Sequence, residues 1–175
     1  MQAPLLDPLQ IPLLYNPGMP NTHILQGPRA AHAGQLRLGC SAVLLDASGA
    51  QVLLTCRSDN GQWCLPGGKV DSGESVTESI EREFFEETSL RVKVQRLTGV
   101  YSNPDSLVVY PDGNKIHFVV LNFLVEWVSG EMALSKETID IRYFPVETAV
   151  KMDLFHNHSE HLRDALAGQG MAFIK

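Results

Sequence analysis

Three glutamates, Glu83, Glu86 and Glu87, have the residue type and spacing of a metal-binding or acid–base site. They fall in residues 74–88, a segment without Gly or Pro that is rich in good helix formers and therefore predicts a helix. Residues three and four apart are neighbours on a helix, so the three carboxylates share one arc of its surface. That arc overlaps an apolar stripe, which must face the core and consists of Val76, Ile80 and Phe84.

Crowded carboxylates beside a core-facing stripe repel one another, and burial raises the cost of each charge. Arg82 offsets only part of this charge. A hard divalent cation, Mg²⁺ or Mn²⁺, prefers carboxylate oxygens and suits the arrangement. A merely solvated acidic face belongs on the opposite side of the helix, where Glu78 and Glu81 are expected. The spacing alone leaves two interpretations open, a metal site and a structural ion-pair network.

The loop before the predicted helix favours the metal site. It contains Pro66-Gly67-Gly68 and then Asp71-Ser72-Gly73-Glu74, so glycines bracket a turn in which the backbone must approach another group closely. A backbone carbonyl from this turn could complete an octahedral site of oxygen ligands. The alternative, a tight strand-to-helix loop, explains each glycine singly but not the three crowded glutamates that follow.

The remaining elements must position this loop and helix. Apolar, β-rich stretches predict strands at residues 36–45, 51–57, 62–65, 92–101, 116–128 and 141–144. An amphipathic helix is expected at residues 159–167, with Gly168 as its stop. Many strands with one internal and one terminal helix favour an α+β fold in which helices flank a mixed sheet.

The loop and helix together resemble the Nudix box, the signature of the Nudix hydrolase (MutT-like) family. The segment has Gly68, five residues, Glu74, seven residues, and then Arg82-Glu83-Phe84-Phe85-Glu86-Glu87-Thr88-Ser89-Leu90. The family pattern is Gly-x5-Glu-x7-Arg-Glu-U-x-Glu-Glu-x-Gly-U, with U a bulky apolar residue. The match over residues 68–90 is near-complete, and Ser89 stands where the pattern has glycine. The resemblance implies a Nudix-type α/β/α sandwich with a mixed β-sheet, a catalytic loop-helix and a C-terminal helix, in a domain spanning residues 35–175.

The resemblance also implies a metal centre. The carboxylates of Glu83, Glu86 and Glu87 and the carbonyl of Gly67 are expected to bind the catalytic divalent ion, which is Mg²⁺ with Mn²⁺ as a substitute. Glu83 is further expected to act as, or to orient, the base that takes a proton from the attacking water.

Other matching residues are implied to support this centre. Gly68 and Glu74 are expected to shape the site, and Arg82 to hold the glutamates by charge-assisted hydrogen bonds. Family members often draw a further acid from a later loop, as metal ligand or base. Glu137 is the candidate here, and an exposed loop glutamate is the alternative reading of that residue.

The box does not reveal the substrate beyond a nucleoside diphosphate linked to a variable group. Arg57, just before a hairpin turn, is a candidate for binding phosphate, and a solvated hairpin arginine is the alternative. Trp63 and Tyr101 are candidates for stacking on a base, with a core position as the alternative for Trp63. Pro104, 14 residues beyond Leu90, is similar in position to a downstream proline associated with ADP-ribose hydrolases.

Three hypotheses for the function result. The first is Mg²⁺-dependent hydrolysis, by metal-activated water, of the pyrophosphate bond in an ADP-ribose-like or nucleotide-sugar substrate. The second is a nucleoside triphosphate pyrophosphohydrolase that clears damaged nucleotides. The third is a Nudix-like nucleotide-binding module without turnover, which has no need for the full set of Arg82, Glu83, Glu86 and Glu87.

Composition bounds the class of protein and its partners. The chain has 175 residues, 44% of them apolar and 19% charged, as in one globular domain. Its formal charge of −6 argues against nucleic acid as the main partner, because proteins that neutralise phosphates are usually basic.

Two sets of residues are expected to take no part in the chemistry. The cysteines are predicted to be small buried hydrophobes and the histidines a solvated helix start: Cys40, Cys56 and Cys64, and His156, His158 and His161.

The N-terminal residues 1–34 are expected to form a Pro-rich extended arm, because most of the prolines of the chain fall there. The arm is also apolar, so it is expected to pack on its own domain or on a second subunit, and the latter would make a homodimer. It lacks a basic n-region, and no apolar run is long enough to span a bilayer. A cytoplasmic protein without a membrane partner is therefore expected.

Overall fold

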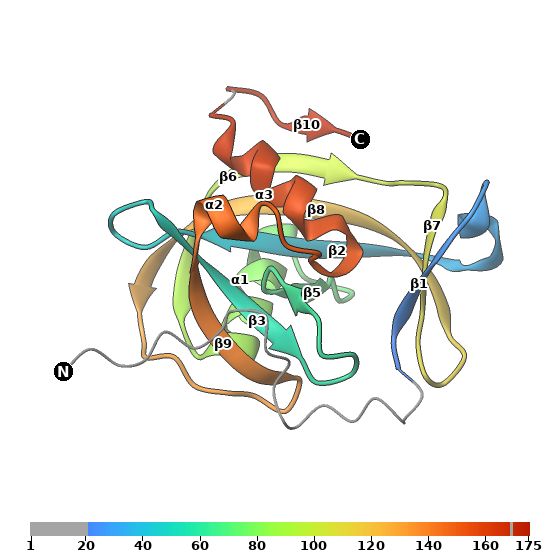
Figure 1. Cartoon of the computed structure of the whole chain (residues 1–175), viewed down its shortest axis with the longest axis horizontal. Helices are drawn as coiled ribbons and strands as arrows, with labels where there is room; N and C mark the ends of the chain where they lie inside the picture. Colours follow the sequence, from blue (N-terminus) through green and yellow to red (C-terminus); the bar gives the residue numbers. More distant parts are fainter. Residues whose placement is uncertain (1–20, 169) are drawn as a thin grey trace.

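The chain folds into two sheets held between helices, and the computed structural model describes residues 21–168 and 170–175 of it (Figure 1). The elements in chain order are β1 (His23–Gln26), the 3₁₀ helix η1 (Ala30–Ala33), β2 (Gln35–Leu44), β3 (Gln51–Arg57), β4 (Trp63–Cys64), β5 (Gly67–Lys69), α1 (Val76–Thr88), β6 (Arg91–Tyr101), β7 (Ser106–Val109), β8 (Lys115–Ser129), β9 (Thr138–Pro145), α2 (Val146–Ala149), the 3₁₀ helix η2 (Phe155–Asn157), α3 (His158–Leu166) and β10 (Phe173–Ile174). None of the described helices is long and apolar enough to cross a membrane.

Strand β8 is central to a mixed, seven-stranded sheet. Along one edge β8 pairs in parallel with β2, from Ile116 opposite Gln35 to Val125 opposite Leu44. Along its other edge it pairs antiparallel with β7 and then with β6. Strands β1, β5 and β10 extend this sheet by pairing with β7, β2 and β6. A second sheet has the order β4-β3-β9.

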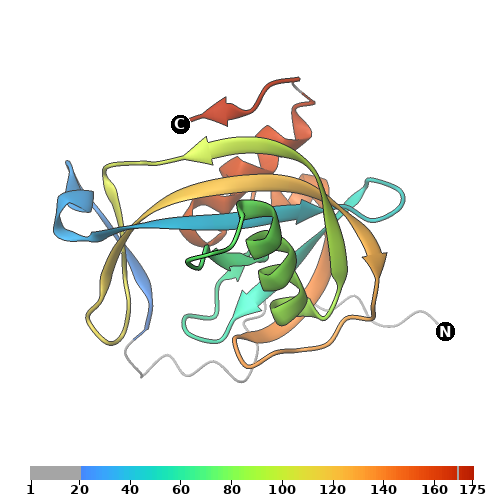
Figure 2. The same ribbon diagram turned by 180° about the vertical axis from the view of Figure 1, so that it is seen from behind.

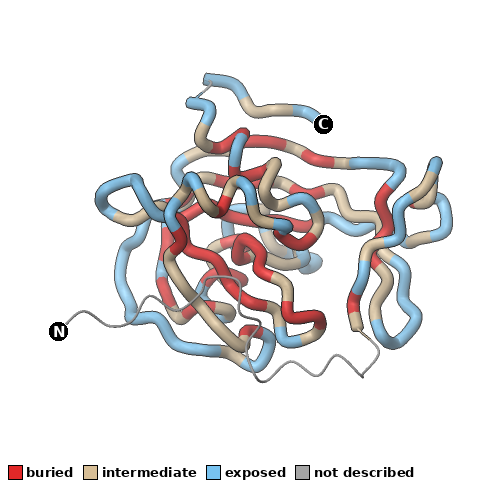
Figure 3. The backbone as a smooth tube through the Cα atoms, in the orientation of Figure 1, coloured by how far each residue is buried: buried red, intermediate tan, exposed pale blue. Residues whose placement is uncertain are grey.

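The two larger of three hydrophobic clusters among the described residues form because successive side chains of a strand point to opposite faces. One core lies toward α3 and includes Val43, Leu54 and Leu162. The other lies toward α1 and includes Leu44, Leu53 and Phe84. Helices α2 and α3 therefore cover one side (Figure 1) and α1 the other (Figure 2), while buried residues follow the central strands (Figure 3). This arrangement confirms the predicted α+β fold with a mixed sheet, a loop-helix and a C-terminal helix.

Helix α1 begins and ends at residues with specific capping roles. It begins at Val76, two residues later than predicted, because Ser75 and Glu78 form a capping box: Ser75 Oγ accepts the Glu78 N–H at 3.2 Å, and the Glu78 carboxylate accepts the Ser75 N–H at 2.8 Å. It ends at Thr88 and is capped by Ser89, whose φ of 61° places it in the left-handed region that usually favours glycine.

The sequence did not predict several of the short strands. Residues 66–68 were expected to be a loop, but Gly67 and Gly68 belong to β5, in which Gly67 pairs with Ser41 of β2. Only glycine allows this approach, because a Cβ on Gly67 would lie 2.1 Å from the Cys40 carbonyl oxygen. Strand β1 pairs with β7, so the described part of the expected arm packs on its own domain. Residues 1–20 lie outside the described residues.

Candidate active site

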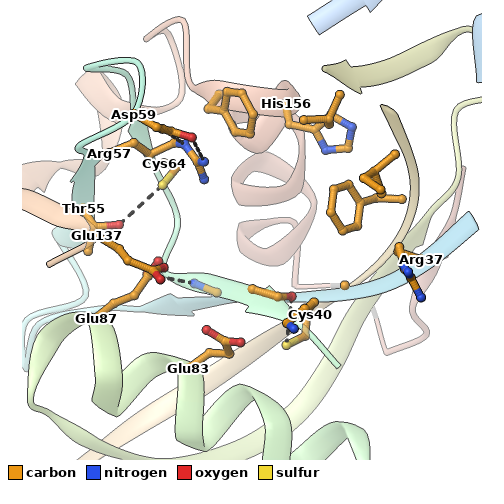
Figure 4. A pocket seen from close by; sticks show the side chains of 18 of the residues that line it. Arg37, Cys40, Thr55, Arg57, Asp59, Cys64, Glu83, Glu87, Glu137 and His156 are labelled. Carbon is orange, nitrogen blue, oxygen red and sulfur yellow. Dashed lines mark hydrogen bonds and ion pairs between the residues drawn. The ribbon is translucent and has the colours of Figure 1, made fainter. Parts of the chain in front are cut away.

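An open cleft of about 1100 Å³ lies between α1 and the segment that leads into α3. Helix α1 and β5 form one side of it, and the ends of β3 and η2 contribute to the other. Figure 4 shows Glu83 and Glu87 pointing from α1 into this space, with Arg57 and His156 across from them. The arc of glutamates predicted from the sequence therefore faces a cleft and not bulk solvent.

Arg82 ties together the acids at the edge of the cleft. Its guanidinium binds Glu74 through two contacts, Nε to Oε1 at 2.6 Å and Nη2 to Oε2 at 2.9 Å. Its Nη1 reaches Glu83 Oε1 at 2.9 Å and Glu86 Oε2 at 3.0 Å. The hydrogen bonds from Arg82 lower the pKa of Glu74 to about 2. Arg82 thus contacts the acids that the resemblance expected it to hold, and Glu74 is one of its partners.

Glu83 is the most buried of the three glutamates, with 9% of its surface exposed. Its carboxylate lies directly over Gly68, where a Cβ would come within 2.4 Å of Glu83 Cδ. Gly68 is therefore needed to make room for the carboxylate. Burial raises the pKa of Glu83, although Arg82 acts in the opposite direction.

Glu87 lies one turn further along α1, beside the other glycine. The Gly67 N–H donates to Glu87 Oε2 at 3.1 Å. Burial raises the pKa of Glu87 to about 8, and neither the Gly67 hydrogen bond nor the charge of Arg57 offsets it. The two carboxylates thus flank adjacent residues of β5, and for each of them the effect of burial on the pKa outweighs that of the nearby arginine.

A divalent cation fits these donors. They are carboxylate oxygens, the ligand type that hard cations prefer, and a cation would supply the positive charge that their burial calls for. Within residues 21–168 and 170–175, no three Asp, Glu, His or Cys side chains already form a metal-binding group. The Gly67 carbonyl, or movement of Glu86 away from Arg82, is therefore needed to complete the ligand set.

Glu137 and Arg57 line the same cleft, as predicted. Glu137 immediately precedes β9, and its carbonyl accepts the Ser58 N–H at 2.9 Å, which fixes it beside the end of β3. Its charge raises the pKa of Glu83 and Glu87 as a lesser cause. Arg57 is held by two contacts with Asp59, at 2.8 and 2.5 Å, and lies 4.4 Å from the Phe155 ring centroid.

The structure places Trp63 and Tyr101 elsewhere, so their assignment to substrate stacking is wrong. Trp63 is 6% exposed and packs edge-on against Phe144, with ring centroids 4.8 Å apart. Tyr101 stacks on His161 and donates its hydroxyl hydrogen to Asp164 Oδ2 at 2.9 Å. Neither residue lines the cleft.

The expectation of a solvated histidine cluster is also wrong. His161 is 2% exposed, and burial lowers its pKa to about 3. His156 lines the cleft with a pKa lowered to about 4, again by burial, and its φ is 52°. The cleft residues that the sequence did not single out include three aromatic ones: Tyr110, Phe118 and Phe155. At these positions no local sequence pattern shows that a side chain lines a cleft.

The prediction for the cysteines is confirmed, since all three are free and buried.

Comparison with known proteins assigns this arrangement to a family. A family model described as the NUDIX domain matches residues 35–166, most of the chain. The chain belongs to the Nudix hydrolase family. The resemblance stated from the box is confirmed. Nudix hydrolases generally use a divalent metal ion, which agrees with the donors that flank β5.

Individual relatives share the Nudix domain. An "ADP-ribose pyrophosphatase" of Methanocaldococcus jannaschii is 35% identical over 109 residues, which cover 61% of this chain and 61% of that protein. The "Nucleoside triphosphatase NudI" of Escherichia coli is 30% identical over 118 residues, covering 63% of this chain and 84% of that protein. The crystal structure of an ADP-ribose pyrophosphatase from Streptococcus suis matches with a TM-score of 0.62 at 22% identity, over 79% of this chain and 98% of that one, which is a likeness of fold.

Proposed function

We propose that this Nudix protein hydrolyses the pyrophosphate bond of a nucleoside diphosphate linked to another group, with an ADP-ribose-like compound or a nucleotide sugar as substrate. The observation that carries the proposal is the pair of carboxylates, buried Glu83 and half-buried Glu87, which flank Gly68 and Gly67 on one side of an open cleft. The name of the Methanocaldococcus relative supports the choice of substrate.

In this proposal Mg²⁺, or Mn²⁺ in its place, is held by Glu83, Glu86 and Glu87 and by the Gly67 carbonyl. When bound, the ion offsets the negative charge of the pyrophosphate and lowers the pKa of water. Arg82 keeps Glu83 in place through Oε1, and Glu83 Oε2 has no hydrogen-bond partner among the described residues. Glu83 Oε2 is therefore the atom that accepts the proton of the attacking water or orients that water. Glu137, on the other wall, is the second candidate base.

The other side of the cleft is proposed to bind the rest of the substrate. Nε and Nη2 of Arg57 are occupied by Asp59, while Nη1 has no hydrogen-bond partner among the described residues and is available to a phosphate oxygen. The half-buried ring of Phe118 offers apolar surface to a base in the same cleft.

Two alternatives use the same site. A nucleoside triphosphate pyrophosphohydrolase is supported by the similarity to NudI. A binding module without turnover is the other, and the complete set of Arg82, Glu83, Glu86 and Glu87 weighs against it. The location in the cytoplasm and the homodimer stay predictions from the sequence.

Chromatographic detection of the nucleoside monophosphate product, over a panel of nucleotides with Mg²⁺, tests the proposal. The panel includes ADP-ribose, nucleotide sugars and nucleoside triphosphates, and it is run on wild type, Glu87→Gln and the matched control Glu81→Gln from the same helix. Turnover of a linked diphosphate by wild type and Glu81→Gln, with at least about a 100-fold loss in Glu87→Gln, is expected. Activity on triphosphates alone favours the first alternative. No turnover with Mg²⁺ or Mn²⁺ favours the binding module, and full activity of Glu87→Gln contradicts the site.

A further inference from the structure

A hydrogen bond from the C-terminal helix reaches the backbone just before the proposed metal ligand Gly67. The Leu65 N–H donates to His158 Nδ1 at 3.0 Å, across 93 positions of the sequence. We propose that His158 is a positioning residue, which holds residues 65–67 so that the Gly67 carbonyl faces the metal ion. The inference rests on the function proposed above and assigns to it a residue outside the Nudix box.

The segment that carries Gly67 is held by the pairing of β4 with β3 and of β5 with β2, and between these two strands by the backbone groups of Leu65, Pro66 and Gly67. Pro66 has no N–H, so Leu65 and Gly67 provide the only backbone donors on either side of it. The Gly67 N–H goes to Glu87 of α1 at 3.1 Å, and the Leu65 N–H goes to His158 of α3. The Pro66 carbonyl accepts the Ala42 N–H of β2 at 2.9 Å. Opposite layers of the sandwich therefore hold the two donors, and loss of the His158 contact would leave the Leu65 donor unpaired.

Helix α3 is anchored firmly enough to serve as a fixed point. The His161 ring stacks on Tyr101 of β6, with centroids 3.7 Å apart and an interplanar angle of 21°. The Tyr101 hydroxyl donates to Asp164 Oδ2 at 2.9 Å, and Lys175 Nζ reaches the same carboxylate at 2.9 Å. His158, at the first turn of this helix, is thus tied to the large sheet independently of residues 65–67.

The role demands one tautomer of the imidazole. Because Nδ1 accepts the Leu65 N–H, the proton of the neutral ring must be on Nε2. Burial lowers the pKa of His158 well below its ordinary value, in agreement with a neutral ring. A replacement must therefore place an acceptor where Nδ1 lies. The side-chain oxygen of asparagine is in that place, whereas that of glutamine is one atom further out, where Nε2 lies.

The test compares His158→Asn, which retains the acceptor, with His158→Gln and His158→Leu, which do not. Glu160→Gln is the control for a change on α3, since Glu160 contacts Lys175 and not residues 65–67. Three quantities are measured: the dissociation constant for Mn²⁺ without nucleotide, hydrogen exchange of the Leu65 amide without metal, and kcat and KM for the best substrate.

We expect His158→Gln and His158→Leu to weaken Mn²⁺ binding about tenfold or more and to lower kcat about 10- to 100-fold. KM should stay within about threefold, and exchange of the Leu65 amide should accelerate at least about tenfold, because its acceptor is gone. His158→Asn and Glu160→Gln should stay within about threefold of wild type on every measure.

Three results overturn the proposal. The first is that His158→Gln and His158→Leu leave both the Mn²⁺ affinity and the exchange of the Leu65 amide unchanged. The second is that His158→Asn is impaired as much as His158→Gln. The third is a rise in KM alone, which indicates that His158 contacts the substrate. Mn²⁺ binding and hydrogen exchange require no turnover, so they decide the role of His158 even if wild type hydrolyses no nucleotide. Wild-type protein that binds Mn²⁺ without turnover refutes the proposed function only, and wild-type protein that binds no Mn²⁺ refutes both.

Discussion

The substitution Glu87→Gln is expected to stabilise the metal-free protein while it removes most of the activity. The amide keeps the size of the side chain, and its oxygen can still accept the Gly67 N–H that now donates at 3.1 Å. It removes a negative charge from a group whose pKa burial raises to about 8. Metal-free wild type must either protonate Glu87 or keep an uncompensated charge there, and the variant avoids both.

The size of the effect follows from the pKa of Glu87. A raised acid pKa lowers stability as pH rises, because the native state retains a proton that the unfolded chain has released. The rise from 4.5 to about 8 corresponds, at roughly 1.4 kcal/mol per unit, to about 5 kcal/mol above pH 8. Water in the open cleft screens part of this, so we expect about 2 kcal/mol at pH 8 and a much smaller difference at pH 5.

Urea unfolding in EDTA at pH 5 and pH 8 measures this difference. Glu81→Gln is the matched control, because Glu81 lies on the same helix, accepts the Val94 N–H at 3.3 Å and does not line the cleft. Addition of Mg²⁺ at pH 8 should then stabilise wild type more than Glu87→Gln. The reasoning is refuted if Glu87→Gln is no more stable than wild type at pH 8 in EDTA, or if its gain is the same at both pH values.

Three further perturbations test other parts of the account. Gly68→Ala should lower kcat at least about 100-fold with an unchanged circular dichroism spectrum, because its Cβ would lie 2.4 Å from Glu83 Cδ; wild-type kcat contradicts this. Ser89→Gly should raise the free energy of unfolding in urea by about 1 kcal/mol at unchanged kcat, since φ is 61°; a less stable variant counts against it. Removal of residues 1–20 should convert a dimer to a monomer in light scattering, and an intact protein that is already monomeric ends that prediction.

The loop and helix of the Nudix box were predictable because their signals are local. Helix periodicity alone puts Glu83, Glu86 and Glu87 on one arc, and the structure turns that arc into the cleft. The glycines before it predicted a close backbone approach, and the structure identifies the approaching groups as β2 at Gly67 and the Glu83 carboxylate at Gly68. The family and the fold class followed from the same residues.

The rest depends on contacts that no local pattern encodes. Trp63 and Tyr101 have the side chains of a base-stacking pair, but their place is decided by packing against Phe144 and His161, far away in the sequence. Strand β5 is too short for a periodic signal and forms because β2 offers it a partner. The bond from Leu65 to His158 crosses 93 positions, so only the tertiary structure shows it.

The most direct test of the central claim is a crystal soaked in Mn²⁺ with a nucleotide bound. The claim is that Glu83 and Glu87 tolerate burial because a divalent ion shares the cleft with them. An anomalous peak within ligand distance of these carboxylates and the Gly67 carbonyl is the predicted result. A well-ordered nucleotide in the cleft with no anomalous peak beside them would contradict it.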